Sequence, residues 1–399
     1  MSKPVSTNPA NRFCDLTKYI NSWTDLLGVD ILDPVLKFNY RTWTTIFAII
    51  NFTVFTLYSM SDNGGDWLVS LKASLMMGGL LHGLGKFLTC IVKQKEMRSL
   101  TLFTQSIYAE YEKRDISYCS TLDTNIDRIQ RIMKGIGYGY VVTNFLMVFT
   151  PLAMLVYNDS RMTVMMYEIP GLPIHKTFGY ALTFLIQLVT ICVRGFGFYA
   201  GDLFVMLGLT QILTFSDILN LKIKDLNSVL SLKAEKRVLL PVGAPIEGEE
   251  ERQRLLIEMI KWHQLFTDYC RSVNKLYNPL ITTQVLAMAY EIMASFCINL
   301  NGFHSPSAIN FVLAAYCMSV YCVMGTKIEF AYDEAYENIC NVSWYELSGE
   351  QRKIFGMILR ESQSPQNIKL LGVWSLSVRT ALQIIKLIYS ASMLMTGGD

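Results

Sequence analysis

Seven long apolar runs divide this chain, and they constrain its fold more than any other feature. Each is long enough to cross the hydrocarbon core of a bilayer, which takes about 17 to 25 helical residues. With 17% charged residues and a mean hydropathy of +0.29, the chain does not fit the alternative of a large soluble helical protein, since such proteins average about 25% charged residues. We therefore predict an all-α membrane protein with seven spans, at residues 43–60, 67–92, 135–157, 177–199, 277–303, 309–330 and 370–395.

The distribution of Lys and Arg predicts the orientation of these spans. The segment before the first run and every second segment after it carry 26 basic residues, whereas the other four segments carry 2. Because basic residues are retained on the cytoplasmic side, we predict a cytoplasmic N-terminus and an extracellular C-terminus. This orientation argues against a G-protein-coupled receptor. A secondary transporter would show repeated halves and broken helices, and a membrane enzyme would need paired carboxylates or histidines at one depth; neither pattern is evident.

The runs also predict how the chain is organised. A proline-free stretch from residue 177 to 215 continues as an apolar stripe to residue 230, so the fourth span should project into the cytoplasm. A loop is expected at residues 236–248, and an amphipathic helix on the inner membrane surface at 14–29. The expected segments are a cytoplasmic N-terminal segment (1–42), spans 1 to 4 (43–204), a cytoplasmic helical extension (205–276), spans 5 and 6 (277–330), a cytoplasmic anchor helix (331–369), span 7 (370–395) and an extracellular tail (396–399).

A polar helix is predicted between the last two spans, in the sequence WYELSGEQRKIFGMILRESQSP at 344–365. Ser348 and Gln351 have the spacing of a capping box, and Pro365 should end the helix. Its apolar residues cluster on one side, and the other cytoplasmic extensions also have one apolar face. We expect these helices to pack against one another across subunits, so that the polar helix holds an oligomer together.

The C-terminal third resembles the insect odorant receptors. The signature of that family reads roughly W-Y-E-L, a charged helix, then R-x-Q-x-P, and further matches are YCVMG at 321–325 and an acid after the fourth span. The chain departs from the family pattern at Cys340, Glu361, Ala381, Ala391 and Ser392. The matching residues are Asp202, Trp344, Tyr345, Glu346, Leu347, Gln363, Pro365, Lys386, Tyr389 and Ser390.

This resemblance implies a tuning odorant receptor subunit, of a mosquito-like kind, in a tetrameric ligand-gated non-selective cation channel. The expected location is the plasma membrane of an olfactory sensory neuron, and the expected partner is the odorant receptor co-receptor, in a heterotetramer. The ligand would be a small volatile organic molecule, aromatic or heterocyclic, and membrane lipid would surround the protein. Enzyme activity, a cofactor, a metal and nucleic acid are not expected. The alternative is a gustatory-type channel of the same superfamily, whose typical ending the tail lacks.

By the same resemblance, the odorant would lie in an apolar pocket among the outer halves of spans 2, 3, 4 and 6. Aromatic and Met side chains suit such a pocket because they give contact area and adapt to the ligand's shape, although each could instead be an ordinary packing residue. Tyr316 and Phe184 are the preferred candidates, and the amide of Gln187 could find its partner in a ligand. The expected ligand-binding residues are Ala73, Met76, Met77, Met147, Val148, Leu152, Tyr180, Phe184, Gln187, Ala315, Tyr316 and Ser319.

The last span is expected to line the pore. A ring of apolar side chains can close a pore by excluding water, and this assigns the gate to Leu394 with Met393. Helical steps back from Leu394 place Ser390, Leu387 and Gln383 on the same face. The alternative is that this face simply contacts lipid. The expected subunit-anchor residues are Trp344, Tyr345, Leu347, Phe355 and Pro365.

Several basic residues lie inside the predicted spans, where a charge needs a partner. Arg194 precedes Asp202 by eight residues and could reach it only through a bent helix or another segment. Glu291 is the better candidate for an internal partner of one of these cations.

Overall fold

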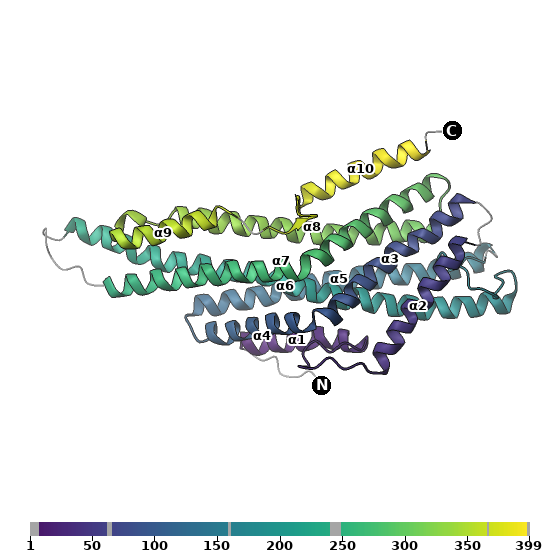
Figure 1. Ribbon diagram of the computed structural model, residues 1–399, viewed down its shortest axis with the longest axis horizontal. Helices are drawn as coiled ribbons and strands as arrows, with labels where there is room; N and C mark the ends of the chain where they lie inside the picture. The colour runs from purple at the N-terminus through teal and green to yellow at the C-terminus, as the bar shows by residue number, and fades with distance from the viewer. Residues whose placement is uncertain (1–7, 62–65, 159–160, 240–248, 365–366, 397–399) are drawn as a thin grey trace.

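The protein is an elongated bundle of helices (Figure 1), seen in a computed structural model that describes residues 8–61, 66–158, 161–239, 249–364 and 367–396. Over these residues the fold is all-helical apart from one short hairpin, as predicted. The elements are α1 (Pro9–Leu26), α2 (Tyr40–Ser61), α3 (Trp67–Val92), α4 (Gln94–Tyr111), α5 (Ile116–Asn158), α6 (Thr177–Leu239), α7 (Glu249–Leu300), α8 (Ser305–Cys340), the 3-10 turn η1 (Trp344–Glu346), α9 (Gly349–Ser362), β1 (Lys369–Leu370), β2 (Trp374–Ser375) and α10 (Val378–Thr396).

Six of the described helices are long and apolar enough to cross a membrane. They are α2, α3, α5, α6, α7 and α8, and they coincide with the first six predicted spans, except that α7 ends at Leu300, before the predicted end of the fifth span at residue 303. The helix at the seventh predicted span, α10, has 19 residues and carries Arg379 and Lys386; it is not among these six. The seventh span and the side of the membrane that each terminus faces remain predictions.

Several helices continue well beyond the apolar runs. The 63 residues of α6 form one helix, which confirms that the helix of the fourth run continues far beyond its apolar part, but the helix reaches Leu239 and so takes in the start of the loop predicted at 236–248. Residues 93–131, which connect the second and third predicted spans, form α4 and the first part of α5. Likewise α7 passes through Pro279 without a break, changing direction near the middle of its length (Figure 1), as expected where a proline removes a backbone donor.

The start of the last helix differs from the prediction. The apolar run suggested a span from residue 370, whereas residues 369–375 form the β1–β2 hairpin and α10 begins at Val378. The turn of the hairpin contains Leu371 and Gly372, both with positive φ (51° and 74°). A helix cannot contain such a turn, so hydropathy alone overestimates the length of this element.

The amphipathic α1 packs on three other helices of the bundle. Its buried residues Phe13, Leu16 and Ile20 face α4, α5 and α6. The ring of Phe13 stacks on Tyr108 of α4, with 4.3 Å between centroids. The first part of the apolar stripe is therefore in the protein core, whereas Leu26 at its end is 47% exposed; contact of this helix with the membrane surface stays a prediction.

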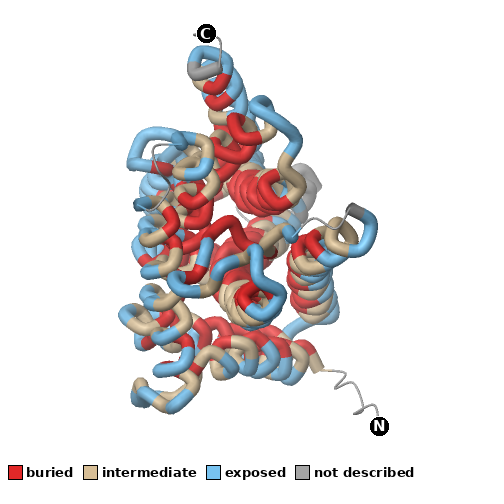
Figure 2. Tube along the Cα trace, turned by 90° about the vertical axis from the view of Figure 1, so that its right-hand side faces the viewer, coloured by how far each residue is buried: buried red, intermediate tan, exposed pale blue. Residues whose placement is uncertain are grey.

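Two apolar clusters fill the bundle. The larger joins α1 and the polar ends of the long helices to the middle of the molecule, while the smaller lies among α2, α3, α5, α6 and α7 near the loop that connects α5 to α6. Figure 2 looks along the bundle and shows buried residues concentrated in its middle, with the C-terminal helix projecting from one edge.

Candidate ligand-binding and pore sites

Five of the predicted ligand-binding residues meet in the smaller apolar cluster. Met76 and Met77 come from α3, Met147 and Val148 from α5, and Phe184 from α6. Met76 and Met147 are almost completely buried, because both lie on the inner faces of their helices and belong to the same apolar cluster. Ala73, one turn before Met77 on α3, is buried as well.

The segment between α5 and α6 closes this cluster, which the sequence did not indicate. Val164, Met165 and Tyr167 are each at most 2% exposed. The ring of Tyr167 packs edge-on against that of Phe52, with 5.5 Å between the ring centroids. Ser59 of α2 holds the same segment, since its hydroxyl accepts a hydrogen bond from the backbone N–H of Glu168 at 2.7 Å. The run of apolar residues from Met162 to Tyr167 was the signal available, but it is too short to separate a loop from a buried segment.

Gln187 and Tyr180 of α6 bind this inserted segment. The Gln187 side chain accepts from the Met165 N–H at 3.0 Å and donates to the Tyr167 carbonyl at 2.9 Å. The Tyr180 hydroxyl donates to the Met162 carbonyl at 3.1 Å, and its ring lies 6.2 Å from that of Phe184. Gln187 therefore has protein partners at membrane depth, and the reason given for a ligand at that position no longer holds.

The remaining predicted ligand-binding residues lie elsewhere. The Tyr316 hydroxyl donates to the Gly135 carbonyl at 2.7 Å, and its ring occupies the space beside Gly139. Gly135 and Gly139 thus allow close packing of α5 against α8. Ala315 and Tyr316 pack on the larger cluster, while Ser319 and Leu152 are exposed. The structure thus groups the α3, α5 and α6 candidates and separates them from the α8 candidates.

A buried carboxylate joins four helices at the centre of the bundle. Asp202 of α6 accepts the ammonium of Lys86 from α3, the hydroxyl of Tyr140 from α5 and the hydroxyl of Tyr321 from α8, each at 2.6 Å. The side chains of Lys86 and Asp202 are 2% and 3% exposed. The sequence marked Asp202 by resemblance alone and did not identify Lys86, 116 positions away, as its partner.

A second cation in the spans, the half-buried Arg194, reaches Glu291 through an asparagine. Its Nη2 donates to Asn310 Oδ1 at 3.2 Å, and Asn310 Nδ2 donates to Glu291 Oε2 at 3.5 Å. The expected pairing of Glu291 with a cation in the spans is therefore indirect. Among the described residues, Arg194 Nη1 and Glu291 Oε1 are buried without a hydrogen-bond partner.

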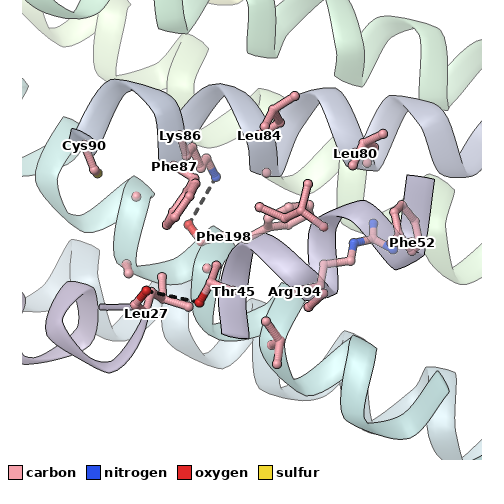
Figure 3. Close-up of a pocket in the computed structure, with 18 of the residues that line it drawn as sticks. Leu27, Thr45, Phe52, Leu80, Leu84, Lys86, Phe87, Cys90, Arg194 and Phe198 are labelled. Atoms are coloured by element: carbon pink, nitrogen blue, oxygen red, sulfur yellow. Dashed lines mark hydrogen bonds between the residues drawn. The ribbon is translucent and has the colours of Figure 1, made fainter. Parts of the chain in front are cut away.

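A cavity opens beside these groups, between α2, α3 and α6 (Figure 3). The connection from α1 to α2 closes one end of it, where the Thr45 hydroxyl donates to the Leu27 carbonyl at 3.1 Å. Lys86 and Arg194 lie in its wall, which is otherwise almost entirely apolar. None of the twelve predicted ligand-binding residues lines this cavity.

The five predicted pore residues share one face of α10. Gln383, Leu387, Ser390, Met393 and Leu394 are all exposed, and Leu394 is the most exposed of them at 81%. The opposite face of α10 carries its buried residues and packs on α7 and α8. The pore face is therefore free of contacts within the subunit, a property that a pore and a lipid-facing surface would share.

The anchor residues divide into a buried and an exposed set. Leu347 and Phe355 are buried within the subunit, whereas Trp344 and Tyr345 are 48% and 59% exposed. Pro365 lies outside the described residues. The predicted capping box of α9 is present, with both Ser348–Gln351 hydrogen bonds formed.

One departure from the family signature also has a structural role. Glu361, which stands where the signature has arginine, forms an ion pair with Arg271 of α7 at 2.6 Å. The pair links α9 to the polar end of α7.

Comparison with known proteins gives consistent matches. The sequence model of a family described as 7tm odorant receptor matches residues 69–389. Odorant receptor 83c of Drosophila melanogaster is 64% identical over 391 residues, which cover 98% of both chains. Odorant receptor 22c of the same fly is 21% identical over 126 residues, or 31% of each chain.

Solved structures share the fold. The insect olfactory receptor OR5 from Machilis hrabei, solved in complex with eugenol, aligns with a TM-score of 0.74 at 11% identity, over 97% of this chain and 100% of that one. The structure of OR5 described without eugenol aligns over the same shares with a TM-score of 0.70 at 10% identity.

Proposed function

Because this chain belongs to the odorant receptor family, we propose that it is the odorant-binding subunit of a ligand-gated, non-selective cation channel in the plasma membrane of olfactory sensory neurons. Its membership also makes it a receptor-family protein rather than an enzyme. The observation that carries the channel proposal is the face of α10 that bears Gln383, Leu387, Ser390 and Leu394, which is exposed along its whole described length. Four such faces around an axis would make a continuous wall, and Leu394 with Met393 would close it by excluding water.

The odorant site is proposed at the smaller apolar cluster, around Met76, Met147 and Phe184. This cluster joins α3, α5 and α6 next to the inserted segment at 162–169, so a ligand bound there could move helices that also hold the central Asp202. Met side chains adapt to different shapes, and an aromatic or heterocyclic volatile would stack on Phe184 and Tyr180. The eugenol bound to the OR5 fold is an aromatic ligand of this kind.

The partner proposed is the odorant receptor co-receptor, in a heterotetramer. Trp344, Tyr345, Ile354 and Met357 form an exposed apolar surface on η1 and α9. An apolar surface at the polar end of a subunit supports its burial against another subunit, while Leu347 and Phe355 would hold the same elements to their own subunit.

Topology gives the first test. With tags at the two termini of the full chain, we expect an antibody to reach the C-terminal tag on intact cells and the N-terminal tag only after permeabilisation. The physical reason is the retention of basic residues on the cytoplasmic side, 26 against 2. Each tag serves as the control for the other. Staining of the N-terminal tag on intact cells would contradict the orientation.

Ligand-gated current gives the second test. We expect aromatic volatiles from a broad panel to evoke cation current in cells that express this chain with the co-receptor, and a cell line without this chain to be silent to them. Phe184→Ala should then raise the half-maximal concentration about tenfold, equivalent to about 1.4 kcal/mol of lost ligand contact. The matched control is Phe178→Ala on the same helix, since Phe178 is 78% exposed.

The outcomes separate the two parts of this proposal. If odorants evoke current and Phe184→Ala leaves the half-maximal concentration unchanged, the odorant binds elsewhere and the channel function stands. Absence of ligand-evoked current from complexes that reach the cell surface, over the whole panel, would count against the channel function itself.

A further inference from the structure

We infer that the cavity between α2, α3 and α6 is a second ligand site, distinct from the proposed odorant site, for an apolar chain that carries one carbonyl oxygen. In the proposed orientation this cavity lies in the inner half of the membrane, since it is lined by the first half of α2, which starts on the cytoplasmic side, and the second half of α3. The odorant site lies in the outer half.

The shape of the cavity results from four glycines. Gly79, Gly83, Gly197 and Gly201 line it, and a Cβ at Gly79 would come within 2.9 Å of Arg194 Nη2, and one at Gly201 within 2.6 Å of the Lys86 side chain. The glycines therefore let two long cationic side chains lie inside the bundle. The volume that remains is about 80 Å³, several times the roughly 10 to 15 Å³ that one water molecule requires.

The mouth of the cavity faces lipid. Thr190, Val193 and Gly197 of α6 line the interior, whereas Val189 and Phe196 beside them are 58% and 42% exposed. Across the opening, Ala48 and Ile49 of α2 line the cavity and Phe47 is 68% exposed. An apolar molecule dissolved in the bilayer can therefore enter sideways without crossing a polar rim.

Arg194 selects the chemistry of the occupant. Figure 3 shows its guanidinium extending along the cavity toward Phe52, and its Nη1 is the buried donor without a partner among the described residues. A buried donor left without an acceptor destabilises the protein, and more so when the donor is charged. An acceptor on the ligand would remove that cost.

The charges around the cavity favour a neutral acceptor over an anion. Lys86 is already paired with Asp202, and Arg194 is linked to Glu291 through Asn310. An added carboxylate would lie near two buried carboxylates with no further cation to pair with it. An ester or ketone oxygen can accept the hydrogen bond that Arg194 Nη1 lacks without adding charge. The apolar chain of the ligand would pack on the wall formed by Phe52, Leu80, Leu84 and Phe87.

This chemistry has two sources, an ester of a bilayer lipid or a free volatile ester, and photolabelling of the complex with the co-receptor in cell membranes separates them. One arm uses a phosphatidylcholine with a diazirine in its acyl chain, and the other a free diazirine-bearing fatty-acid ethyl ester. We expect at least one probe to label the peptides that contain residues 43–56 of α2 or 186–200 of α6. The arm that labels identifies the source.

Variants test whether the label reports the cavity. Leu84→Trp fills it, and Leu81→Trp, three residues earlier on α3 at a position 50% exposed, is the matched control. We expect Leu84→Trp to reduce labelling about tenfold and Leu81→Trp to leave it unchanged. Ala48→Leu fills the cavity from α2 with a smaller change, and it provides the same comparison if Leu84→Trp does not reach the membrane.

Competition tests the role of Arg194. An unlabelled ester should displace the probe at a concentration about tenfold lower than the hydrocarbon of equal length, which corresponds to about 1.4 kcal/mol for one hydrogen bond to a charged donor. Equal labelling of the filled variant and the control, no labelling of either peptide by either probe, or equal competition by ester and hydrocarbon would each overturn the inference. All of these readouts are independent of odorant-evoked current.

Discussion

Asp202→Ala is expected to remove the assembled receptor from the cell surface. The substitution leaves the ammonium of Lys86 buried without its counter-ion and removes the acceptor of two tyrosine hydroxyls. Breaking a buried ion pair from one side costs about 3 to 5 kcal/mol, a large part of the roughly 5 to 15 kcal/mol that stabilises a typical domain. Since about 1 to 2 kcal/mol already changes cellular abundance several-fold, we expect little mature complex by surface biotinylation.

Two further variants separate the loss of the ion pair from the loss of a carboxylate as such. Asp333→Ala removes an exposed aspartate of α8 and should leave the surface level unchanged. The double variant Lys86→Met/Asp202→Asn removes both charges and retains an amide oxygen to accept from the tyrosines. It should recover much of the lost surface level, because a buried pair can often be replaced by neutral groups at little cost. If the double variant is as poorly expressed as Asp202→Ala, the uncompensated Lys86 charge is not the cause.

The importance of Asp202 illustrates what could be predicted from this sequence. Its position after the fourth run was marked by resemblance, but its partners come from α3, α5 and α8, separated from it by 116, 62 and 119 residues. Hydrophobic periodicity is a local property, and it predicts which residues are buried in a helix without predicting which helices face one another. The same limit explains why Met76, Met147 and Phe184 were predicted in one ligand pocket with Tyr316, from which the structure separates them.

Local signals predicted local structure accurately. The Ser348–Gln351 spacing gave the cap of α9, and the proline-free stretch after residue 177 gave the continuous α6. The inserted segment at 162–169 has no period of its own, and its burial depends on Ser59 and Gln187 from two distant helices. It could therefore not be separated from an ordinary loop. Gly372 was the available signal for the turn before α10, and the apolar residues around it obscured that signal.

Gly325→Ala is expected to uncouple the pore helix from the rest of the subunit. Gly325 of α8 is buried directly beneath the segment that leads into α10, and a Cβ at this position would overlap the backbone carbonyl oxygen of Leu376. A carbonyl cannot move aside as a flexible side chain can, so α8 and this segment must separate, at a cost of about 1 to 3 kcal/mol. The neighbouring hydrogen bond from the Val378 N–H to the Thr326 hydroxyl, 3.0 Å long, would break with them.

This substitution should affect gating more than assembly. The exposed surface of η1 and α9 and the Arg271–Glu361 pair lie away from Gly325, so the complex should still form. The base of α10, by contrast, would lose its defined position on α8. We therefore expect the maximal ligand-evoked current per surface complex to fall about tenfold, which corresponds to about 1.4 kcal/mol in the opening equilibrium, with surface biotinylation close to that of the unmodified chain.

Gly356→Ala on α9 is the matched control for Gly325→Ala. Both glycines lie inside helices, so alanine improves the helix propensity at each by about 1 kcal/mol, and the two variants differ in what the new methyl group meets. At Gly356 nothing lies within 4 Å of the added Cβ, whereas at Gly325 it meets the backbone before α10. Normal current from Gly356→Ala with reduced current from Gly325→Ala would assign the loss to that contact. Equal currents from the two variants would mean that the contact between α8 and the base of α10 does not control the pore.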